Sequence, residues 1–535
     1  MSETQPAGKQ QAVPKGLLLF IFALAYLYLF ARILWRIGDE GMLVYGAQMV
    51  TQGALPYRDF FEVMGPGSFY WLALFFQVFG TTIAVAQGLL VVTAAVVILL
   101  IYWMTRRVYR GPFELLPSLL FLAIGVPLWA GTSHHWDAIF FGLLAVAAFF
   151  LWQDRKRTWF LALAGALAGV TSCFMQPKGL YLVLALLLAV WINARRAGAA
   201  ASRTWAHLGI LLGSYAAVGG VVLLCFAVAG GLHDLIDANL LWPLQNYSNL
   251  NVCPYGYGLM EVLFPSYVKV LDYLLPFPVN RIAGGLILVP FALVYCLPVL
   301  LVGLTGVWCR RRENRSRIFS AVLLPYWTAD LALWVSELHR KDFMHLIYGA
   351  PLQLILFMVI WHYNFAAKKM LNAVGLGLLS LSVLAFGALN GLLAASASEI
   401  ITTRRGAVYA FKQDPALNFL IKHTKPGDYV FVYQYYPMYY FLADVKNPTR
   451  YFTLVSNFHT DAQFYEAIAS LEQKKVKYVL WDTLVAGDNI KIWFPQYSTA
   501  TEANLRLEQY LQEHYQVIGL ENGFRILRRR DLPAD

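Results

Sequence analysis

The chain has 535 residues, of which 59% are hydrophobic and only 14% are charged, and its mean hydropathy is +0.54. This composition excludes a soluble globular protein and indicates a polytopic membrane protein. The net charge of +11 does not indicate a nucleic-acid partner, because the basic residues cluster in short loops between apolar segments.

The chain begins with a polar segment, residues 1–16, which is expected to be a cytoplasmic tail. The apolar run 17–35 is too long for the core of a cleaved signal peptide, and we interpret it as an uncleaved signal anchor. Further apolar runs have membrane-spanning length and bring the expected number of spans to eleven. The expected spans are 17–35, 82–104, 114–130, 136–152, 159–175, 178–194, 206–229, 282–308, 318–336, 343–362 and 371–396.

The loops between these spans differ in charge, and the difference predicts the orientation. Eighteen Lys and Arg residues fall in one set of alternate loops and seven in the other set before the last span. Because basic residues favour the cytoplasmic side, the N-terminus is predicted inside and the end of the chain outside. Two shorter apolar segments, 68–79 and 258–277, are expected to lie along the outer membrane interface.

After residue 396 the composition becomes polar, which predicts one small extracytoplasmic domain over 397–535. We expect Thr403-Arg404-Arg405 to be a polar linker. Helices and strands then alternate, which is typical of an α/β sheet with mostly parallel strands, closed by a hairpin. The expected helices are 415–423 and 461–474, the expected strands are 429–433 and 476–481, and the hairpin strands are 515–520 and 524–527.

This topology gathers polar side chains from four outer loops at one membrane face. They are Asp39, Glu40, Arg58, Asp59 and Glu62, then His134, His135 and Asp137, then Lys178, and finally His339, Arg340, Lys341, Asp342 and His345. Ionisable groups at a membrane boundary are costly, so a functional site is the first hypothesis.

Each group also has a structural interpretation. Asp39 and Glu40 could cap a juxtamembrane helix that begins at Met42. Lys178 could extend its ammonium group to the headgroups, and Arg340 could be an ordinary loop charge.

Carboxylates combined with Arg, Lys and His at a membrane surface suit one reaction class. A sugar carried on a polyprenyl phosphate presents its anomeric carbon just outside the bilayer. Cations would hold the departing phosphate, and a carboxylate would accept the proton of the attacking acceptor. Such a site needs no cofactor, and no clustered Asp motif calls for a metal.

The first outer loop, 36–80, resembles that of the GT-C fold glycosyltransferases, in the protein mannosyltransferase-like group that includes the lipid A aminoarabinose transferases. The resemblance rests on Gly38-Asp39-Glu40-Gly41, on the run from Gly53 to Glu62, and on the run from Gly65 to Trp71. Residues 132–141, Gln176-Pro177-Lys178-Gly179 and residues 340–351 are also similar to segments of that group. Residues 17–396 are therefore expected to form a GT-C-like catalytic module.

The resemblance implies roles for individual residues. Asp39 would be the catalytic carboxylate, with Glu40 in support and Asp137 as the acid of the second outer loop. Glu62-Val63-Met64 replaces a Glu-Lys-Pro sequence of the aminoarabinose transferases, so a phosphate-binding lysine is missing. The candidates for the donor phosphate are Arg58, Lys178, Arg340 and His345, and the further candidates for the site are Glu62 and His135.

The prediction is a multi-pass enzyme of a bacterial inner membrane or a plasma membrane. It would transfer a hexosyl or pentosyl group from a polyprenyl phosphate to a hydroxyl or amine of a glycan, lipid or protein. One alternative is a transporter or flippase of a lipid-linked sugar, which should carry charges inside its spans. Here the expected spans hold few charges apart from Arg32 and Asp330. The other alternative is a sensor or assembly factor with an inert membrane anchor.

Overall fold

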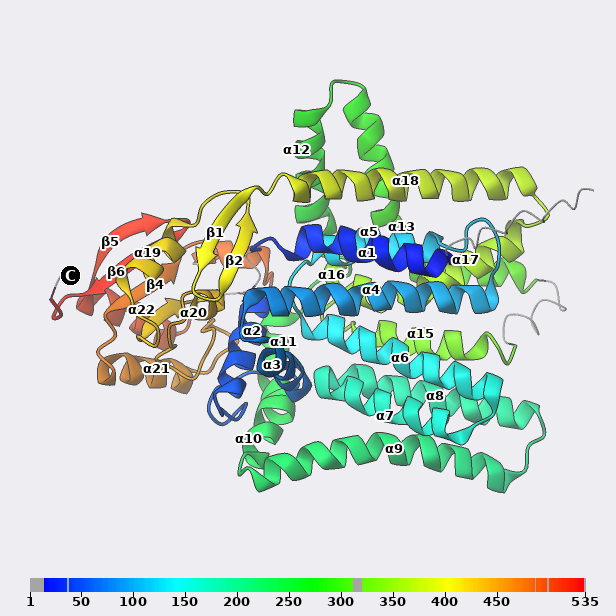
Figure 1. The fold of residues 1–535 in the computed structure, drawn as a ribbon, viewed down its shortest axis with the longest axis horizontal. Helices are drawn as coiled ribbons and strands as arrows, with labels where there is room; N and C mark the ends of the chain where they lie inside the picture. Colours follow the sequence, from blue (N-terminus) through cyan, green and yellow to red (C-terminus); the bar gives the residue numbers. More distant parts are fainter. Residues whose placement is uncertain (1–13, 36–37, 311–319, 486, 498–499, 534–535) are drawn as a thin grey trace, which may run out of the picture.

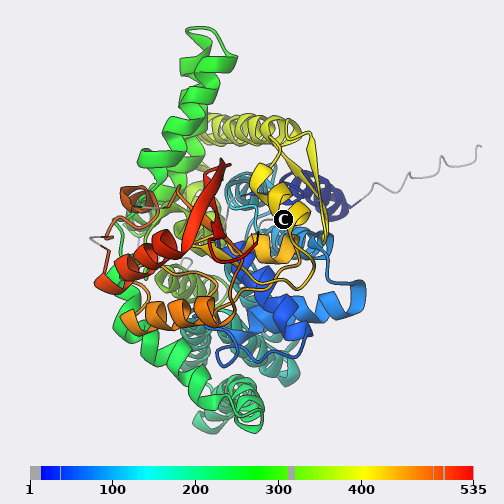
Figure 2. The same ribbon diagram turned by 90° about the vertical axis from the view of Figure 1, so that its left-hand side faces the viewer.

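A computed structural model describes residues 14–35, 38–310, 320–485, 487–497 and 500–533. The expected tail up to residue 13, Arg36 and residues 311–319 of the basic loop lie outside the described residues. The described chain forms a helical bundle with a smaller mixed domain at one end (Figure 1). Viewed from that end, the C-terminal domain covers the middle of the bundle (Figure 2).

The membrane part is almost entirely helical. Its longer helices are α1 (Lys15–Ala31), α2 (Gly38–Thr51), α3 (Pro66–Phe79), α4 (Ile83–Val108), α5 (Leu116–Ile124), α6 (His134–Arg155), α7 (Thr158–Phe174), α8 (Gln176–Arg196), α9 (Ala201–Val228), α12 (Phe264–Leu274), α13 (Val279–Trp308), α15 (Leu324–Ser336), α17 (Pro351–Phe365) and α18 (Lys369–Ala395). Short helical turns connect them: η1 (Val126–Leu128), α10 (Leu232–Ile236), η2 (Asp237–Leu241), η3 (Pro243–Tyr247), α11 (Ser248–Asn251), η4 (Leu259–Leu263) and α16 (Phe343–Gly349).

Every expected span overlaps a helix among the described residues, so the polytopic helical class is confirmed. Among the described residues, six helices are long and apolar enough to cross a membrane alone, namely α4, α6, α8, α9, α13 and α18. The pair α16 and α17 is bent by 68° and would make a seventh crossing if it counts as one span. Since α1, α5 and α7 are shorter, the number of eleven stays a prediction.

Small residues allow some helices of the bundle to approach closely. Gly165 and Gly169 of α7 face α9, where an added Cβ would meet the backbone at Leu211 and Tyr215. Lipid tails are as apolar as the side chains, so such close packing is a main source of helix association in a membrane. In α13, Pro290 and Pro298 each remove one helical hydrogen bond.

The C-terminal domain contains a four-stranded sheet in the order β3-β4-β6-β5. Its elements are α19 (Pro415–His423), β3 (Val430–Tyr433), α20 (Met438–Leu442), α21 (Asp461–Gln473), β4 (Tyr478–Asp482), η5 (Gly487–Ile492), α22 (Glu502–His514), β5 (Tyr515–Glu521) and β6 (Phe524–Arg529). The closing hairpin is confirmed, with Asn522 and Gly523 at positive φ in its turn.

The expectation of mostly parallel strands is wrong. Only β3 and β4 run parallel, whereas β6 pairs antiparallel with both β4 and β5. The reason is the hairpin itself, because its second strand inserts between β4 and β5 and reverses the direction on both sides.

The expected linker at Thr403-Arg404-Arg405 is instead the turn of a hairpin formed by β1 (Glu399–Thr403) and β2 (Gly406–Ala410). The N–H of Tyr409 donates to the carbonyl of Arg32 at 3.0 Å, and the N–H of Leu34 donates to the carbonyl of Tyr409 at 2.8 Å. The N–H of Ile83 donates to the carbonyl of Arg405 at 2.9 Å. The hairpin thus ties the C-terminal domain to the ends of α1 and α4.

The segment between α1 and α4 and the C-terminal domain share one hydrophobic core. The ring of Tyr45 on α2 lies 5.1 Å from that of Tyr440 on α20, and Phe60 stacks on Phe452 at 4.9 Å. The N–H of Phe61 donates to the carbonyl of Arg450 at 2.8 Å. The domain is therefore packed onto α2 and α3, and this contact sets the space between the domain and the bundle.

We expect Gly41→Ala to weaken this contact, because a Cβ on Gly41 would meet the backbone nitrogen of Met438. Overpacking against backbone costs on the order of 1–3 kcal/mol, so thermal unfolding of the purified protein should begin at a lower temperature. Gly88→Ala in α4 is the matched control, since a Cβ there meets nothing within 4 Å. Equal unfolding temperatures for the two variants would contradict the close packing.

Candidate active site

A cavity of about 1300 Å³ lies between the bundle and the C-terminal domain. Its walls come from the start of α2, the loop before α3, the N-terminal ends of α6 and α8, the segment 339–345, and several segments of the C-terminal domain. Most lining side chains are apolar. The polar side chains of the lining include Asp39, Glu62, His134, His135, Asn251, His339, Arg340, Asp342, His345 and Tyr435, and also Ser172, Gln176, Asn239, Thr453, His459 and Asp482.

Asp39 lies in the first turn of α2, which extends from Gly38 rather than from Met42. Its Oδ1 accepts a hydrogen bond from the hydroxyl of Tyr435 at 3.0 Å. Burial raises the pKa of Asp39, although the Tyr435 bond and the positive charge of Arg340 act against this shift. A carboxylate with a raised pKa is a stronger base, and Asp39 faces the cavity.

The two nearby glutamates differ in position. Glu40 does not line the cavity, and its Oε1 accepts the N–H of Thr132 in the loop before α6 at 3.2 Å. Glu62 does line the cavity. Burial raises the pKa of Glu40 to about 8. Burial and the charge of Asp39 raise the pKa of Glu62 to about 8. Both carboxyls therefore favour the protonated form at neutral pH.

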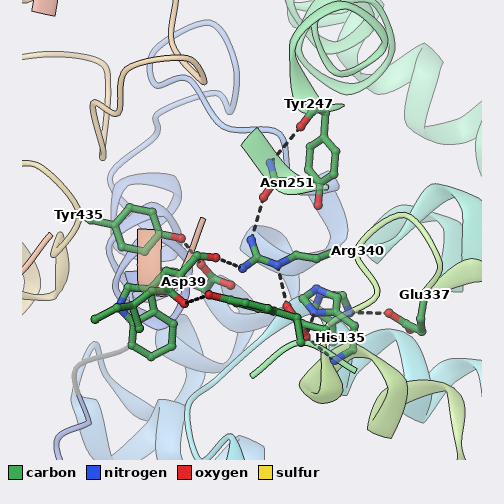
Figure 3. Close-up of polar contacts among 12 residues, drawn as sticks. Asp39, His135, Tyr247, Asn251, Glu337, Arg340 and Tyr435 are labelled. Atoms are coloured by element: carbon green, nitrogen blue, oxygen red, sulfur yellow. Dashed lines mark hydrogen bonds and ion pairs between the residues drawn. The ribbon is translucent and has the colours of Figure 1, made fainter. Parts of the chain in front are cut away.

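Arg340 joins three parts of the molecule (Figure 3). Its Nε donates to Asp342 at 2.6 Å, its Nη1 donates to Asn251 of α11 at 2.8 Å, and its Nη2 donates to the carbonyl of Trp493 at 2.6 Å. The guanidinium also lies 5.0 Å from the ring centre of Phe494. A guanidinium has five N–H donors, so two remain for an anion in the cavity.

Asp342 and two histidines complete this polar group. Asp342 caps α16, and its Oδ1 accepts from the N–H of His345 at 2.9 Å and lies 2.7 Å from its Nδ1. Burial alone would raise the pKa of Asp342, but His345 and Arg340 outweigh it and hold the pKa low. Burial lowers the pKa of His339 to about 4, and His345 adds to the shift. His339 is therefore neutral at pH 7.

Lys178 is placed behind the cavity wall rather than in it. Its ammonium group forms an ion pair with Glu337, and neither side chain has exposed surface. His135 does line the cavity, and its Nδ1 lies 3.5 Å from Glu337. In Figure 3, Arg340 lies between Asp39 on one side and His135 and Glu337 on the other. Lys178 thus balances a buried carboxylate next to the site.

Besides Glu40 and Lys178, two further predicted site residues do not line the cavity. Asp137 is buried in the first turn of α6 and is not part of the lining. Arg58 pairs with its neighbour Asp59 at 2.8 Å, and its side chain is 46% exposed. A phosphate in the cavity would not reach a side chain that points to solvent, so we do not include Arg58 in the site.

Three residues of the site were missed in the sequence. Glu337 directly follows an expected span, and a charge at such a place was a usable signal. Asn251 belongs to a segment that was assigned no role. Tyr435 lies in the C-terminal domain, and nothing local predicts its contact with α2.

The residues present do not suggest a metal centre. Across the described ranges, no group of three or more His, Cys, Asp and Glu side chains is arranged to hold a metal ion. The metal-independent reaction stays a prediction.

No family model and no curated protein sequence matches the chain. Solved structures do match. The oligosaccharyltransferase of Archaeoglobus fulgidus, in complex with zinc and sulfate, is 13% identical with a TM-score of 0.53, over 93% of this chain and 71% of that chain. ArnT from Cupriavidus metallidurans, bound to undecaprenyl phosphate, is 11% identical with a TM-score of 0.53, over 98% of this chain and all (100%) of that chain. The chain therefore has the fold of these GT-C membrane proteins.

The pKa of Glu40 predicts a pH dependence of stability. The folded pKa is about 8 and the ordinary value is 4.5. Between these values the folded state binds more protons than the unfolded state, so stability is highest at low pH and falls as the pH rises. The slope for one such group is at most about 1.4 kcal/mol per pH unit.

Glu40→Gln removes this titration and keeps an oxygen for Thr132, so its unfolding temperature should fall less between pH 5 and pH 8. Asp59→Asn is the control, because its arginine neighbour lowers the pKa of Asp59 and it does not titrate in this window. Parallel curves for the wild type and Glu40→Gln would rule out the buried carboxyl as the cause.

Proposed function

We propose that this GT-C fold chain is a membrane glycosyltransferase that transfers a sugar from a polyprenyl phosphate to an acceptor hydroxyl or amine. One observation carries the proposal. The carboxylate of Asp39 and the guanidinium of Arg340 line the same cavity, at the end of the bundle that the C-terminal domain covers. A general base and a fixed cation in one partly apolar space are what this reaction requires.

Asp39 would act as the general base. The Tyr435 bond holds Oδ1, which leaves Oδ2 to accept the proton of the attacking acceptor. As the acceptor oxygen or nitrogen bonds to the anomeric carbon, the bond from that carbon to the phosphate oxygen breaks. The electron pair of that bond stays on the phosphate, and the proton is then on Asp39.

Arg340 would stabilise the charge that develops on the phosphate. Its other bonds fix the guanidinium before the donor arrives, so little reorganisation accompanies the reaction. His345 is a second candidate for a phosphate contact, because its bond to Asp342 leaves Nε2 available. Lys178 would contribute through its ion pair with Glu337 rather than by direct contact.

The name of one structural neighbour supports the class of donor, since ArnT was crystallised with undecaprenyl phosphate. The sugar, the acceptor and the side of the membrane belong to the proposal. We place the cavity on the extracytoplasmic side, because the loops at the opposite end of the bundle hold most of the basic residues.

Asp39→Asn should reduce transfer by roughly a hundredfold or more, the usual scale of a positioned general base. The variant keeps the shape of the side chain and an oxygen for Tyr435, so the protein should fold. The measurement is transfer from a polyprenyl-phosphate sugar pool to the native acceptor in membranes with equal protein levels. Asp59→Asn, in the same loop and outside the cavity, should transfer at a rate close to wild type. Normal transfer by Asp39→Asn would rule out Asp39 as the general base.

Arg340→Lys should lower kcat more than it changes KM, because a lysine keeps the charge but loses the planar fork. Arg340→Gln should lose roughly a hundredfold in kcat, the scale for removing one preorganised donor. Arg58→Gln removes an exposed charge from the same face and should leave both constants near wild type. Equal losses of activity in Arg58→Gln and Arg340→Gln would show that activity depends on the net charge of this face and not on a phosphate contact by Arg340. As a folding control, Arg340→Lys and the wild type should have the same unfolding temperature.

A further inference from the structure

A second depression lies at the opposite end of the bundle, between α4 and α6, which run side by side in Figure 1. This groove has a volume of about 680 Å³. Its wall is apolar along most of its length, with the side chains of Val96, Leu99, Leu100, Trp103, Leu144 and Leu151. These side chains are only half-buried, so the groove is open to the surroundings of the bundle.

Three arginines of the last turn of α4 and the residues after it, Arg106, Arg107 and Arg110, stand at one end of the groove. Arg107 is fixed in place, because it forms a two-nitrogen pair with Asp154 and lies 4.7 Å from the ring centre of Phe150. Its charge is thereby largely balanced.

The other two arginines are less committed. The Nε of Arg106 lies 3.4 Å from Glu114, and the Nε of Arg110 donates to the carbonyl of Arg106 at 3.3 Å. Their terminal nitrogens make no hydrogen bond to another residue in the described part of the chain. The side chain of Arg106 is 47% exposed. Two guanidinium forks are therefore available to an anion at this end.

The dimensions of the groove match one leaflet of a bilayer. From Val96 to Arg106, α4 rises by about 15 Å at roughly 1.5 Å per residue. This is half of the hydrocarbon thickness of about 30 Å. The arginines would then lie at headgroup depth when the apolar wall contacts one acyl chain.

We propose that this groove binds one anionic glycerophospholipid, with an acyl chain against α4 and α6 and its phosphate held by Arg106 and Arg110. The planar fork of arginine matches two phosphate oxygens. A zwitterionic lipid would bring a second cation next to the arginines, whereas an anionic lipid would not. Basic pockets between membrane helices are suited to anionic headgroups. The proposal does not depend on the reaction at the other end of the bundle.

The test is native mass spectrometry of the full chain, released from mixed micelles with equal amounts of phosphatidylglycerol and phosphatidylcholine of matched chain length. We expect one phosphatidylglycerol to remain on the wild type at an energy that removes phosphatidylcholine. Equal retention of the two lipids would overturn the proposal. So would full competition by inorganic phosphate, which would indicate an anion site without an acyl-chain site.

Arg106→Gln with Arg110→Gln should reduce the retained phosphatidylglycerol roughly thirtyfold, the scale expected for two arginines near an anionic headgroup. The matched control is Arg195→Gln with Arg196→Gln, which removes the same charge at the C-terminal end of α8. Ala147→Phe should also reduce retention, because it fills the groove without changing charge. Retention equal to the wild type in both groove variants would contradict the site, and a dimer in place of a lipid adduct would assign the groove to a second copy. If a variant does not fold, the lipid preference of the wild type still decides.

Discussion

Charges that are removed from water at the covered end of the bundle need partners, and this requirement organises the site. Lys178 and Glu337 are both fully buried and compensate each other across α8 and α15. Arg340 and Asp342 do the same for the segment before α16. Removing one member of a buried pair costs on the order of 3–5 kcal/mol. The pairs therefore fix where the helix ends lie, and the shape of the cavity follows from them.

Much of this arrangement could be predicted from local patterns. Apolar runs of membrane-spanning length predict helix, and the helix over 415–423 begins and ends as expected. The topology predicted from the loop charges assigns five candidate residues to one end of the bundle. All five line one cavity in the structure: Asp39, Glu62, His135, Arg340 and His345. The end of the bundle at which a loop lies follows from the order of the spans along the chain. It can therefore be predicted without knowing how the helices pack.

Other features could not be predicted because they depend on contacts between distant segments. The bond from Tyr435 to Asp39 exists only after the C-terminal domain has packed onto α2. Whether β6 runs parallel or antiparallel to β4 depends on which strand of the hairpin pairs with β4. Arg58 lies in the right loop, but its pairing with Asp59 turns it away from the cavity. Residue type and loop position therefore did not determine which of the charged side chains face inward.

The shared core of α2, α3 and the C-terminal domain has a consequence for biosynthesis. The first outer loop is made early, whereas its partners, such as Tyr440 and Phe452, are made only after the last membrane helix. At roughly 5–20 residues per second, the interval is on the order of 20 to 80 seconds. During that time Tyr45 and Phe60 have no partner from the domain, and the cavity cannot close. Completion of the site is therefore a late event in the life of each new chain.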